Sequence, residues 1–311
     1  MLPIIIAGPT ASGKTAVSRA LAQLINGEII SADSRQVYKY LDIGTNKEGE
    51  LHPEKCCRVT GGICQHLTDI IEPSQIFSAG EFARRADETA ALIAGRGRAT
   101  IITGGTGLYI KAFVDGLSVL PAGDPAVRSA LAGELKTHGL ESLYRQLAAV
   151  DPEAAEKNRN NPQRLTRALE VYRITGIPIS QWHRKAAPRR KICRQFGILW
   201  PRGELNEIIA ARSKSMFSGG MIEETKNALA RGYAKDAPGL QGLGYRSIIR
   251  FIDGTATREE AEAELSLDTR HYAKRQMTWF KKDTRIRWFE TSKSEFNPGA
   301  IAEMIVKEMG I

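Results

Sequence analysis

The sequence predicts an α/β fold, in which helices cross over a parallel sheet and a mainly helical segment is inserted. Three observations support this prediction. Short β-branched runs alternate with segments of helical spacing, a glycine-rich turn joins the first run to the first helical segment, and the middle of the chain has helical patterns without a convincing strand. The helical segment is therefore expected to interrupt a single core.

Five apolar runs are the predicted strands. The first three are residues 2–7 (LPIIIA), 27–33 (GEIISAD) and 99–107 (ATIITGGTG). Each ends at a turn that contains Gly or Asp, and helical segments separate them, which is typical of parallel strands joined by crossover helices. Two later runs, 196–200 (FGILW) and 286–290 (IRWFE), follow long helical stretches, and we expect them to return to the same sheet.

The turn after the first strand has the spacing of a phosphate-binding loop. Residues 8–15 read GPTASGKT and fit the pattern G-x-x-x-x-G-K-[ST]. In such a loop, backbone N–H groups surround phosphate oxygens, the lysine neutralises charge and the hydroxyl holds Mg²⁺. The core is therefore predicted to be P-loop NTPase-like, although the motif does not distinguish a nucleotide such as ATP from another phosphate ester. The predicted diphosphate-binding residues are Gly8, Thr10, Ala11, Ser12, Gly13, Lys14 and Thr15, with Thr15 as the Mg²⁺ ligand.

A helical insertion domain is predicted between residues 119 and 193. Its patterns at 124–139, 140–150 and 161–176 have apolar residues three and four positions apart, and they end at stops such as Gly139 and Gly176. No low-complexity linker separates them. We therefore expect the insertion to pack against the P-loop core domain, which residues 1–118 and 194–311 form.

The composition is that of a globular protein. With 311 residues, of which 42% are apolar and 25% charged, the chain suits one large or two ordinary domains. No run approaches 18 apolar residues and no basic segment precedes the first apolar run, so a cytoplasmic location is expected, without membrane span or signal peptide. Cys56, Cys57, Cys64 and Cys193 have no paired C-x-x-C spacing, which favours reduced thiols over a zinc site or disulfides.

Positive charge is concentrated in two segments. The formal net charge of +9 favours an anionic partner. Residues 119–191 contain thirteen Lys or Arg against seven Asp or Glu, and residues 270–288 contain seven against one, interleaved with aromatic residues. Basic residues with aromatics suit a polyanion whose bases can stack. The same pattern fits an amphipathic helix whose aromatics face the core, so both interpretations stay open.

Polar residues also follow the second and third predicted strands. In open α/β sheets the carboxyl ends of strands gather ligands and reacting groups, so Asp33 is expected to face the P-loop. A lone Asp at such a place is also a common helix N-cap. The turn at 104–112 (GGTGLYIKA) carries Thr106 and three glycines, which let the backbone approach a ligand closely. Three strand ends are therefore expected to converge.

Six motifs follow one another along the chain. They are GPTASGKT (8–15), SADSRQVYKYLDIGTNK (31–47), GGTGLYIKA (104–112), NPQRLTRALEVYRITG (161–176), GLGYR (242–246) and AKRQMTWFKKD (273–283). In this order they make the sequence resemble the tRNA dimethylallyltransferase family nearly from end to end. The resemblance implies transfer of a dimethylallyl group from dimethylallyl diphosphate to N6 of the adenine on the 3′ side of the anticodon. It also implies that the P-loop holds an allylic diphosphate rather than ATP.

The residue types suit this chemistry. Negative charge grows on pyrophosphate as the C1–O bond breaks, so Lys14, the loop amides and Mg²⁺ are expected to stabilise it. By resemblance, Arg212 is a second catalytic cation, whereas Ile208 stands where the family usually has another arginine. The amine of adenine is a weak nucleophile, and Asp33 is the carboxylate that we expect to accept its proton.

The expected partners are dimethylallyl diphosphate and the anticodon stem-loop of tRNA, with the enzyme acting as a monomer. Extruding a stacked adenine costs roughly a few kcal/mol, which contacts with RNA must offset. By resemblance, the residues at the target nucleotide are Asp33, Ser34, Arg35, Gln36 and Thr106, and those at neighbouring RNA are Arg128, Gln163, Arg164, Leu165, Thr166, Arg167, Gln241, Gly242, Leu243, Gly244, Tyr245, Arg246, Lys274 and Arg275. A solvated helix face is the alternative for residues 163–171.

Three other functions stay open at this point. A P-loop kinase of a small metabolite would share the loop and sheet and would turn over ATP, but it does not explain the basic insertion. An adenylate isopentenyltransferase would prenylate a free adenine nucleotide, and the arginine-rich insertion argues against it. A noncatalytic RNA-binding protein would have no use for a P-loop.

Overall fold

The protein is described by a computed structural model that covers residues 1–52, 54, 57–118, 120–185 and 191–311. Val119, where the insertion is predicted to begin, the predicted thiol of Cys56, and Arg189 and Arg190 of the basic surplus lie outside these ranges. The chain divides into two compact units. We call residues 1–114 with 191–311 the core unit, and residues 115–190 the helical unit.

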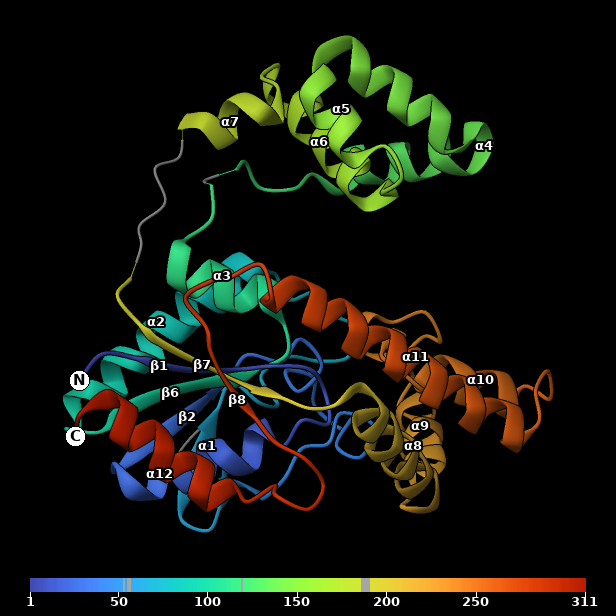
Figure 1. The fold of residues 1–311 in the computed structure, drawn as a ribbon. Coiled ribbons are helices and arrows are strands. Elements are labelled where there is room, and N and C mark those ends of the chain that lie inside the picture. The colour runs from blue at the N-terminus through green and yellow to red at the C-terminus, as the bar shows by residue number, and fades with distance from the viewer. Residues whose placement is uncertain (53, 55–56, 119, 186–190) are drawn as a thin grey trace. The chain divides into compact units, whose positions relative to one another are not determined.

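A mixed sheet forms the centre of the core unit (Figure 1). Within the described residues its strands are β1 (Ile4–Ala7), β2 (Gly27–Ser31), β3 (Glu50–His52), β4 (Cys57–Thr60), β5 (Ile63–His66), β6 (Ala99–Gly104), β7 (Arg194–Leu199) and β8 (Arg287–Glu290). They lie in the order β3-β4-β5-β2-β6-β1-β7-β8, and from β5 to β8 every neighbouring pair is parallel. The five predicted strands are confirmed, and the two late ones do return to the same sheet.

Helices cover both faces of this sheet (Figure 1). Those of the core unit are α1 (Lys14–Leu24), α2 (Ala79–Gly95), α3 (Gly107–Asp115), α8 (Arg202–Ser218), α9 (Met221–Ala230), the 3₁₀ helix η2 (Pro238–Gln241), α10 (Tyr245–Ile252), α11 (Arg258–Phe280) and α12 (Pro298–Met309). A search of the described residues finds no helix with the length and apolar character of a membrane span. The α/β class with a parallel, P-loop-bearing core is therefore confirmed.

The sequence of β1 shows why both faces can be covered. Ile4 and Ile6 pack in one buried cluster with side chains of α1 and α12, whereas Ile5 and Ala7 pack in another with side chains of α2 and α3. Successive side chains of a strand point to opposite faces, so a strand covered on both sides is apolar throughout. The run IIIA therefore encodes a central strand.

Strands β3, β4 and β5 are additions that the sequence analysis missed. They pair antiparallel at one edge of the sheet and are only three or four residues long. One available signal was overlooked: Gly61 and Gly62 connect β4 and β5, with φ values of 56° and 79°. Two consecutive residues of positive φ are what a two-residue hairpin turn requires, and Gly-Gly is one of its signatures.

Helices α9 and α10 hold the loop that follows β2. The carboxylate of Glu224 in α9 accepts hydrogen bonds from the N–H groups of Asp42, Ile43 and Gly44, at 2.6, 2.7 and 3.0 Å. It also accepts one from the hydroxyl of Tyr245, at 2.7 Å. Because this clamp joins the C-terminal helices to the segment after Asp33, it helps to position one wall of the site described below.

The described part of the helical unit contains α4 (Pro125–Val150), α5 (Pro152–Asn158), α6 (Pro162–Thr175) and α7 (Ile179–Lys185), and no strand. Gly139 interrupts α4 with φ 74° and ψ 177°, at the stop that the sequence predicts, so two helical segments abut there. Gly176 ends α6 in the left-handed conformation at φ 69°. Leucines of α4 and α6 form the buried centre of this unit.

The chain leaves the core unit and returns to it at one place. The N–H of Lys191 donates a hydrogen bond to the carbonyl of Val114 at 2.7 Å. The Lys191 ammonium lies 3.8 Å from the centroid of the Phe113 ring and pairs with Asp87. The two chain segments of the core unit that lead to and from the helical unit are thus held together by contacts within the core unit.

We expect the two Asp-Pro helix starts of the helical unit to differ in their effect on stability. Asp151 is 2% exposed, and its carboxylate accepts bonds from the N–H groups of Ala154 (3.1 Å) and Ser180 (2.9 Å). Asp124 is exposed and only caps α4. Asp151→Ala should lower the free energy of unfolding by about 2–3 kcal/mol, because it removes the cap and also leaves the buried N–H of Ser180 without its acceptor. Asp124→Ala removes only a cap and should lower it by about 1 kcal/mol. Urea unfolding measures both, and equal losses would contradict the bridging role of Asp151.

Candidate active site

The phosphate loop connects β1 to α1. Gly13 precedes α1 with φ 80°, and no side chain caps this end of the helix. The first N–H groups of α1 are therefore available to an anion. A Cβ at Gly13 would lie 2.1 Å from a carbon of the Phe296 ring, so both the space and the backbone conformation require glycine. The indole N–H of Trp200 donates to the carbonyl of Ser12 at 3.1 Å, so this bond attaches the loop to the residue that follows β7.

A cavity of about 260 Å³ opens beside this loop, and the ends of β1, β2 and β6 meet at it. Its walls are formed by loop residues Thr10, Ala11, Gly13, Lys14 and Thr15, by Asp33 and Gln36 after β2, by Gly104 and Gly105 at the end of β6, and by Ile208, Arg212 and Gln276 of α8 and α11. Ser12, which was also predicted to bind the diphosphate, is fully buried and does not line this cavity. The structure therefore brings together the three residues expected to be catalytic, Lys14, Asp33 and Arg212. Ile208, which replaces the family's usual arginine, faces the same cavity.

Buried Lys14 and partly buried Arg212 dominate the electrostatics of this cavity. Burial lowers the pKa of Lys14 to about 7, while the Asp33 carboxylate raises it and Arg212 lowers it further. Burial also lowers the pKa of Arg212 from its usual value, against the opposing effect of Asp33 and then Glu48. The Lys14 ammonium donates to the carbonyl of Pro9. Because the lysine is poorly solvated, an anion in the cavity would favour its charged form.

Asp33 combines two functions in one carboxylate. Its Oδ1 atom accepts hydrogen bonds from the N–H groups of Arg35 (2.8 Å) and Gln36 (3.4 Å), so it does cap the turn after β2. The carboxylate also lines the cavity. Within the described residues no hydrogen bond reaches Oδ2, and this oxygen is available to a proton of a ligand. The N-cap alternative and a chemical role are therefore compatible.

The sequence analysis missed several polar residues of the cavity, and two of them, Gln276 and Thr103, are buried. Gln276 of α11 is 6% exposed; its Oε1 accepts from the N–H of Thr10 at 2.7 Å, and its Nε2 donates to the carbonyl of Gly105 at 2.8 Å. The available signal was a glutamine on the helix face that also carries buried Ala273 and Phe280. Thr103 of β6 is 4% exposed, and its hydroxyl has no hydrogen-bond partner in the described structure.

A tyrosine closes the side of the site near the β6 turn. Thr106 accepts a hydrogen bond from the N–H of Ser34 at 3.0 Å, and Tyr272 of α11 lies near it. Burial raises the pKa of Tyr272 to about 12, and the nearby carboxylate of Asp33 adds to this effect. The phenol therefore stays protonated at neutral pH and can donate a hydrogen bond.

Other predicted RNA-binding residues of the core unit serve to hold the fold. Arg35 donates to the carbonyl of Pro238 at 3.0 Å, and Gln241 donates to the carbonyl of Lys235 at 3.3 Å. Tyr245 is 1% exposed, and Gly244 precedes it with φ 84°. The side chain of Tyr245 is therefore assigned to packing, while Gly242, Leu243 and Gly244 shape the turn into α10 and Arg246 is exposed.

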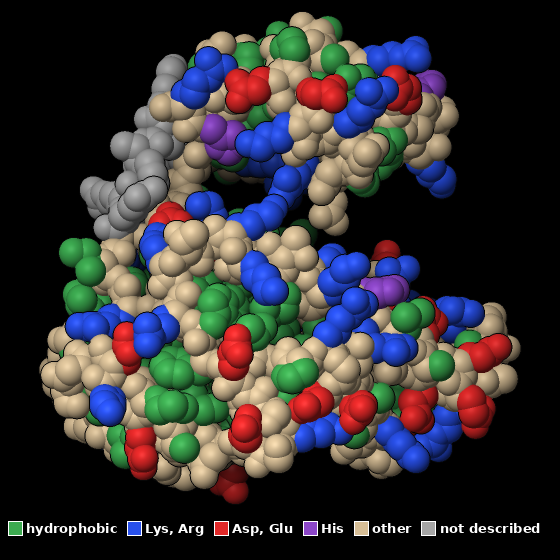
Figure 2. All heavy atoms as spheres, viewed as in Figure 1, with side chains coloured by type: hydrophobic (Ala, Val, Ile, Leu, Met, Phe, Trp, Pro, Cys, Tyr) green, Lys and Arg blue, Asp and Glu red, His purple; other side chains and the backbone are tan. Residues whose placement is uncertain are grey.

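The basic and aromatic cluster at 270–288 covers the end of α11, where it divides between two faces of the helix, and continues to the start of β8. Phe280 is 2% exposed and belongs to the core, as the amphipathic interpretation requires. Lys274 and Arg275 are exposed, and Figure 2 shows Lys and Arg side chains gathered with a histidine over α11. Trp279 is 38% exposed and lies close to Gly107. The amphipathic interpretation is therefore confirmed for Phe280, and binding of a polyanion by the exposed residues stays a prediction.

In the helical unit the predicted RNA-binding residues surround a buried carboxylate. Glu170, which is 1% exposed, pairs with Arg128 at 2.7 Å and with Arg167 at 2.5 Å. A cavity of about 410 Å³ is lined by Arg128, Gln163, Thr166 and Arg167, among others. Arg164 is exposed and reaches only the side-chain oxygen of Asn158, at 3.5 Å. Leu165 is fully buried and is assigned to the packing of this unit.

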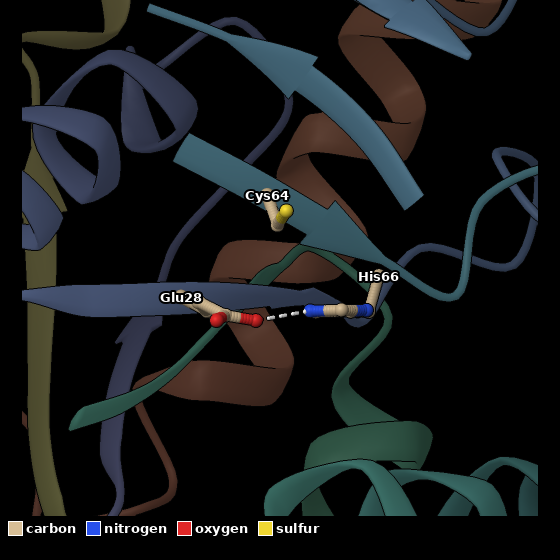
Figure 3. Close-up of side chains that lie close together, drawn as sticks. All are labelled: Glu28, Cys64 and His66. Carbon is tan, nitrogen blue, oxygen red and sulfur yellow. Dashed lines mark hydrogen bonds and ion pairs between the residues drawn. The ribbon is translucent and has the colours of Figure 1, made fainter. Parts of the chain in front are cut away.

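Glu28, Cys64 and His66 form a cluster that could hold a metal ion (Figure 3). Their potential ligand atoms lie within 4.8 Å of one another on β2 and β5. Glu28 already bonds His66 at 2.6 Å, Arg96 at 2.7 Å and Arg98 at 3.1 Å. Burial opposes its ionisation, yet the bonds from His66 and Arg96 keep the pKa of Glu28 below its usual value. A cation would have to displace these bonds.

The cavity beside the P-loop has the oxygen ligands that Mg²⁺ prefers. The hydroxyl of Thr15, the carboxylates of Asp33 and Glu48 and the amide of Asn46 all line it. Mg²⁺ typically uses one or two carboxylates together with water and phosphate oxygens. The donor set therefore fits the ion that the P-loop motif predicts.

Together, the fold and the site define a P-loop protein in which Lys14, Arg212 and the carboxylate of Asp33 line one cavity. A family model described as IPP transferase matches residues 36–283. The tRNA dimethylallyltransferase of Endomicrobium trichonymphae is 46% identical over 278 residues, covering 89% of this chain and 91% of that protein. The enzyme of the same name from Carboxydothermus hydrogenoformans is 41% identical over 313 residues, covering 99% and 97%.

Solved structures agree with these relatives. The full-length tRNA isopentenylpyrophosphate transferase from Bacillus halodurans superposes with a TM-score of 0.70 at 34% identity, covering 99% of this chain and 97% of that one. The corresponding enzyme from Staphylococcus epidermidis has a TM-score of 0.68 at 32% identity, covering 99% and 98%. The chain belongs to the tRNA dimethylallyltransferase family, which confirms the resemblance seen in the six motifs.

The lowered pKa of Lys14 predicts that anion binding takes up protons. The pKa is about 7 in the free site, and a bound diphosphate would raise it, so between pH 7 and about 9 binding should consume protons and weaken as the pH rises. Calorimetry of inorganic diphosphate in buffers of different ionisation enthalpy measures this uptake. Lys14→Met corrects for protonation of the ligand itself, and equal uptake by both proteins would contradict the assignment.

Proposed function

We propose that this protein transfers the dimethylallyl group of dimethylallyl diphosphate to N6 of the adenine on the 3′ side of the anticodon in tRNA. The products are N6-dimethylallyladenosine and diphosphate. The observation that carries the proposal is the single cavity in which the P-loop, Arg212 and Asp33 meet. Cations suited to a leaving diphosphate and a carboxylate suited to accept a proton line this cavity together, which supports the proposal.

The leaving group is stabilised from two directions. As the C1–O bond breaks, its electron pair stays with the diphosphate, and negative charge develops there. The amides at the start of α1, the ammonium of Lys14 and the guanidinium of Arg212, which lies 3.5 Å from the Thr10 hydroxyl, supply fixed positive charge. Mg²⁺ held by Thr15 would add charge stabilisation to the same oxygens.

The nucleophile needs a proton acceptor. When N6 forms its bond to C1 of the donor, the amine nitrogen becomes cationic and must lose a proton. Asp33 is assigned as that acceptor through Oδ2, the oxygen that the turn does not use. The hydroxyl of Thr103, which lacks a protein partner, is assigned to a hydrogen bond with the substrate. Tyr272 and Thr106 supply donors at the entrance from the β6 turn.

Binding of tRNA is assigned to both units. In the core unit the exposed cations Arg246, Lys274 and Arg275 are available to phosphates. In the helical unit Arg164 and Gln163 are exposed, whereas Arg128 and Arg167 are paired with Glu170. Anions attract exposed, unpaired arginine more strongly than arginine that is already compensated. We therefore assign the first phosphate contact of the helical unit to Arg164.

Mass spectrometry of tRNA nucleosides after incubation with dimethylallyl diphosphate and Mg²⁺ tests the proposal directly. Prenylated adenosine in the RNA supports it. Prenylation of free AMP without RNA would instead support an adenylate isopentenyltransferase. Binding and hydrolysis of Mg·ATP, with no product from the allylic donor, would support a small-molecule kinase.

Replacing Asp33 should abolish most of the chemistry while sparing RNA binding. Asp33→Asn keeps an Oδ1 that can cap the turn, whereas Asp33→Ala removes both functions. Single-turnover rates should fall about 10²- to 10⁴-fold in both variants, the usual range for loss of a general base. A loss in Asp33→Ala with wild-type turnover in Asp33→Asn would assign the residue to the turn and not to proton transfer.

Arg164 and Arg167 should respond differently to truncation. Arg164→Ala should weaken tRNA binding and lower the slope of log K against log salt by roughly one, because it removes a phosphate contact. Arg167→Ala should mainly lower the stability of the helical unit, because buried Glu170 loses a partner. Filter binding at several salt concentrations measures the first effect, and Arg145→Ala, a paired and exposed arginine of α4, is the control. An unchanged slope for Arg164→Ala would reject its phosphate contact.

A further inference from the structure

A second cavity of about 340 Å³ lies between the end of β7, α8 and α11 in the core unit. It shares no lining residue with the cavity beside the P-loop, which we call the diphosphate cavity. Its inner surface includes the apolar side chains of Trp200, Leu205 and Met277. Leu267 also lines this cavity and is 45% exposed to solvent. Four cations line it as well, Arg202, Arg270, Lys274 and Lys281, and no carboxylate does.

None of these four cations forms an ion pair or a side-chain hydrogen bond with another residue in the described part of the chain. Other exposed arginines differ among themselves: Arg84 is paired with Glu81 and Glu88, whereas Arg164 and Arg246 have no carboxylate partner among the described residues. The four cations are distinguished by lining one cavity together, beside apolar side chains. Uncompensated cations beside apolar surface match a ligand that has both an anionic part and a flat apolar part. A nucleotide has this combination, with its phosphate and its base.

The arrangement of α11 relates this cavity to the reactive one. Arg270, Lys274, Met277 and Lys281 are spaced by three or four residues and so form one face of the helix. Gln276, from another face, lines the diphosphate cavity. Arg270 and Lys281 are about 16 Å apart along the axis at 1.5 Å per residue. One helix therefore separates the reacting groups from a row of cations long enough for more than one phosphate.

A further hollow extends this row. A cavity of about 340 Å³ is lined by His271, Lys274, Arg275 and Thr278, two of which also line the cavity between α8 and α11. A free mononucleotide would occupy one of these cavities and leave the remaining cations uncompensated. A strand of RNA would place successive phosphates along both. The extent of the cationic row therefore favours a polynucleotide.

We propose that the cavity between α8 and α11 receives the base of an unpaired nucleotide of the tRNA anticodon loop, other than the adenine that reacts. The base lies against Leu267 and Met277, and its flanking phosphates pair with Arg270, Lys274 and Lys281. This inference rests on the proposed function, because it takes tRNA as the substrate. Binding of a second base there would help to offset the cost of opening the stacked loop.

A double-mutant cycle between protein and RNA tests the proposal. An anticodon stem-loop RNA is made in versions that each lack the base at one loop position, and each is bound to the wild type and to Leu267→Ala by filter binding. Leu267→Ala should weaken binding of the intact RNA about 3- to 10-fold, part of the contribution of a stacked base. At one loop position, and not at that of the reacting adenine, removal of the base should cancel this effect.

The cations are tested in parallel by their charge. Arg270→Ala and Lys281→Ala should each lower the salt slope of RNA binding by roughly one. Lys307→Ala, which removes an exposed and unpaired lysine of α12, should leave affinity and slope unchanged. Additive effects of Leu267→Ala at every loop position, or wild-type slopes for Arg270→Ala and Lys281→Ala, would overturn the assignment.

Two further outcomes separate this inference from the proposed function. Saturable binding of free AMP that Leu267→Ala abolishes, with unchanged RNA affinity, would assign the cavity to a free nucleotide and overturn the RNA assignment. Prenyl transfer by the wild type is measured on the same RNA. Absence of product would count against the proposed function, whereas the binding cycle reports on the cavity whether or not product forms.

Discussion

The active-site cavity depends on the amide group of one buried side chain. Gln276 accepts from the N–H of Thr10 and donates to the carbonyl of Gly105, so it ties a C-terminal helix to a loop 266 residues earlier and to the turn after β6. Both bonds are needed at the same time, because a buried amide that loses one partner pays the cost of its desolvation. The positions of the P-loop, the β6 turn and α11 are therefore not independent.

The parts of the fold that the sequence predicts are those with strong local signals. A buried parallel strand such as Ile4–Ala7 is apolar along its whole length, and the loop GPTASGKT is constrained by its backbone conformation. The edge strands β3 to β5 are short and half exposed, so their pairing depends on neighbours distant in sequence. Thr103 and Gln276 join the site only through tertiary packing; the helical spacing of Gln276 with Ala273 and Phe280 indicates that it is buried but not that it reaches this cavity.

Charge was the least predictable feature of the site residues, because sequence shows how many arginines there are but not which are compensated. Arg128 and Arg167 belong to the basic insertion, yet both are paired with Glu170, whose carboxylate is buried. The cations of α11 also belong to a basic segment of the sequence, but they have no carboxylate partner within the described chain. The number of basic residues in a segment therefore differs from the number whose charge is not already compensated by a carboxylate.

The hydrogen bond from Lys191 to Val114 has a consequence for how such a protein can change over evolution. Val114 and Lys191 are the residues of the core unit that flank the inserted segment, and the bond holds them next to each other. For the core, the insertion is then a closed loop whose interior length has a weak, logarithmic effect on the entropy of closure. The helical unit can therefore be lengthened, shortened or exchanged with little effect on the folding of the core unit.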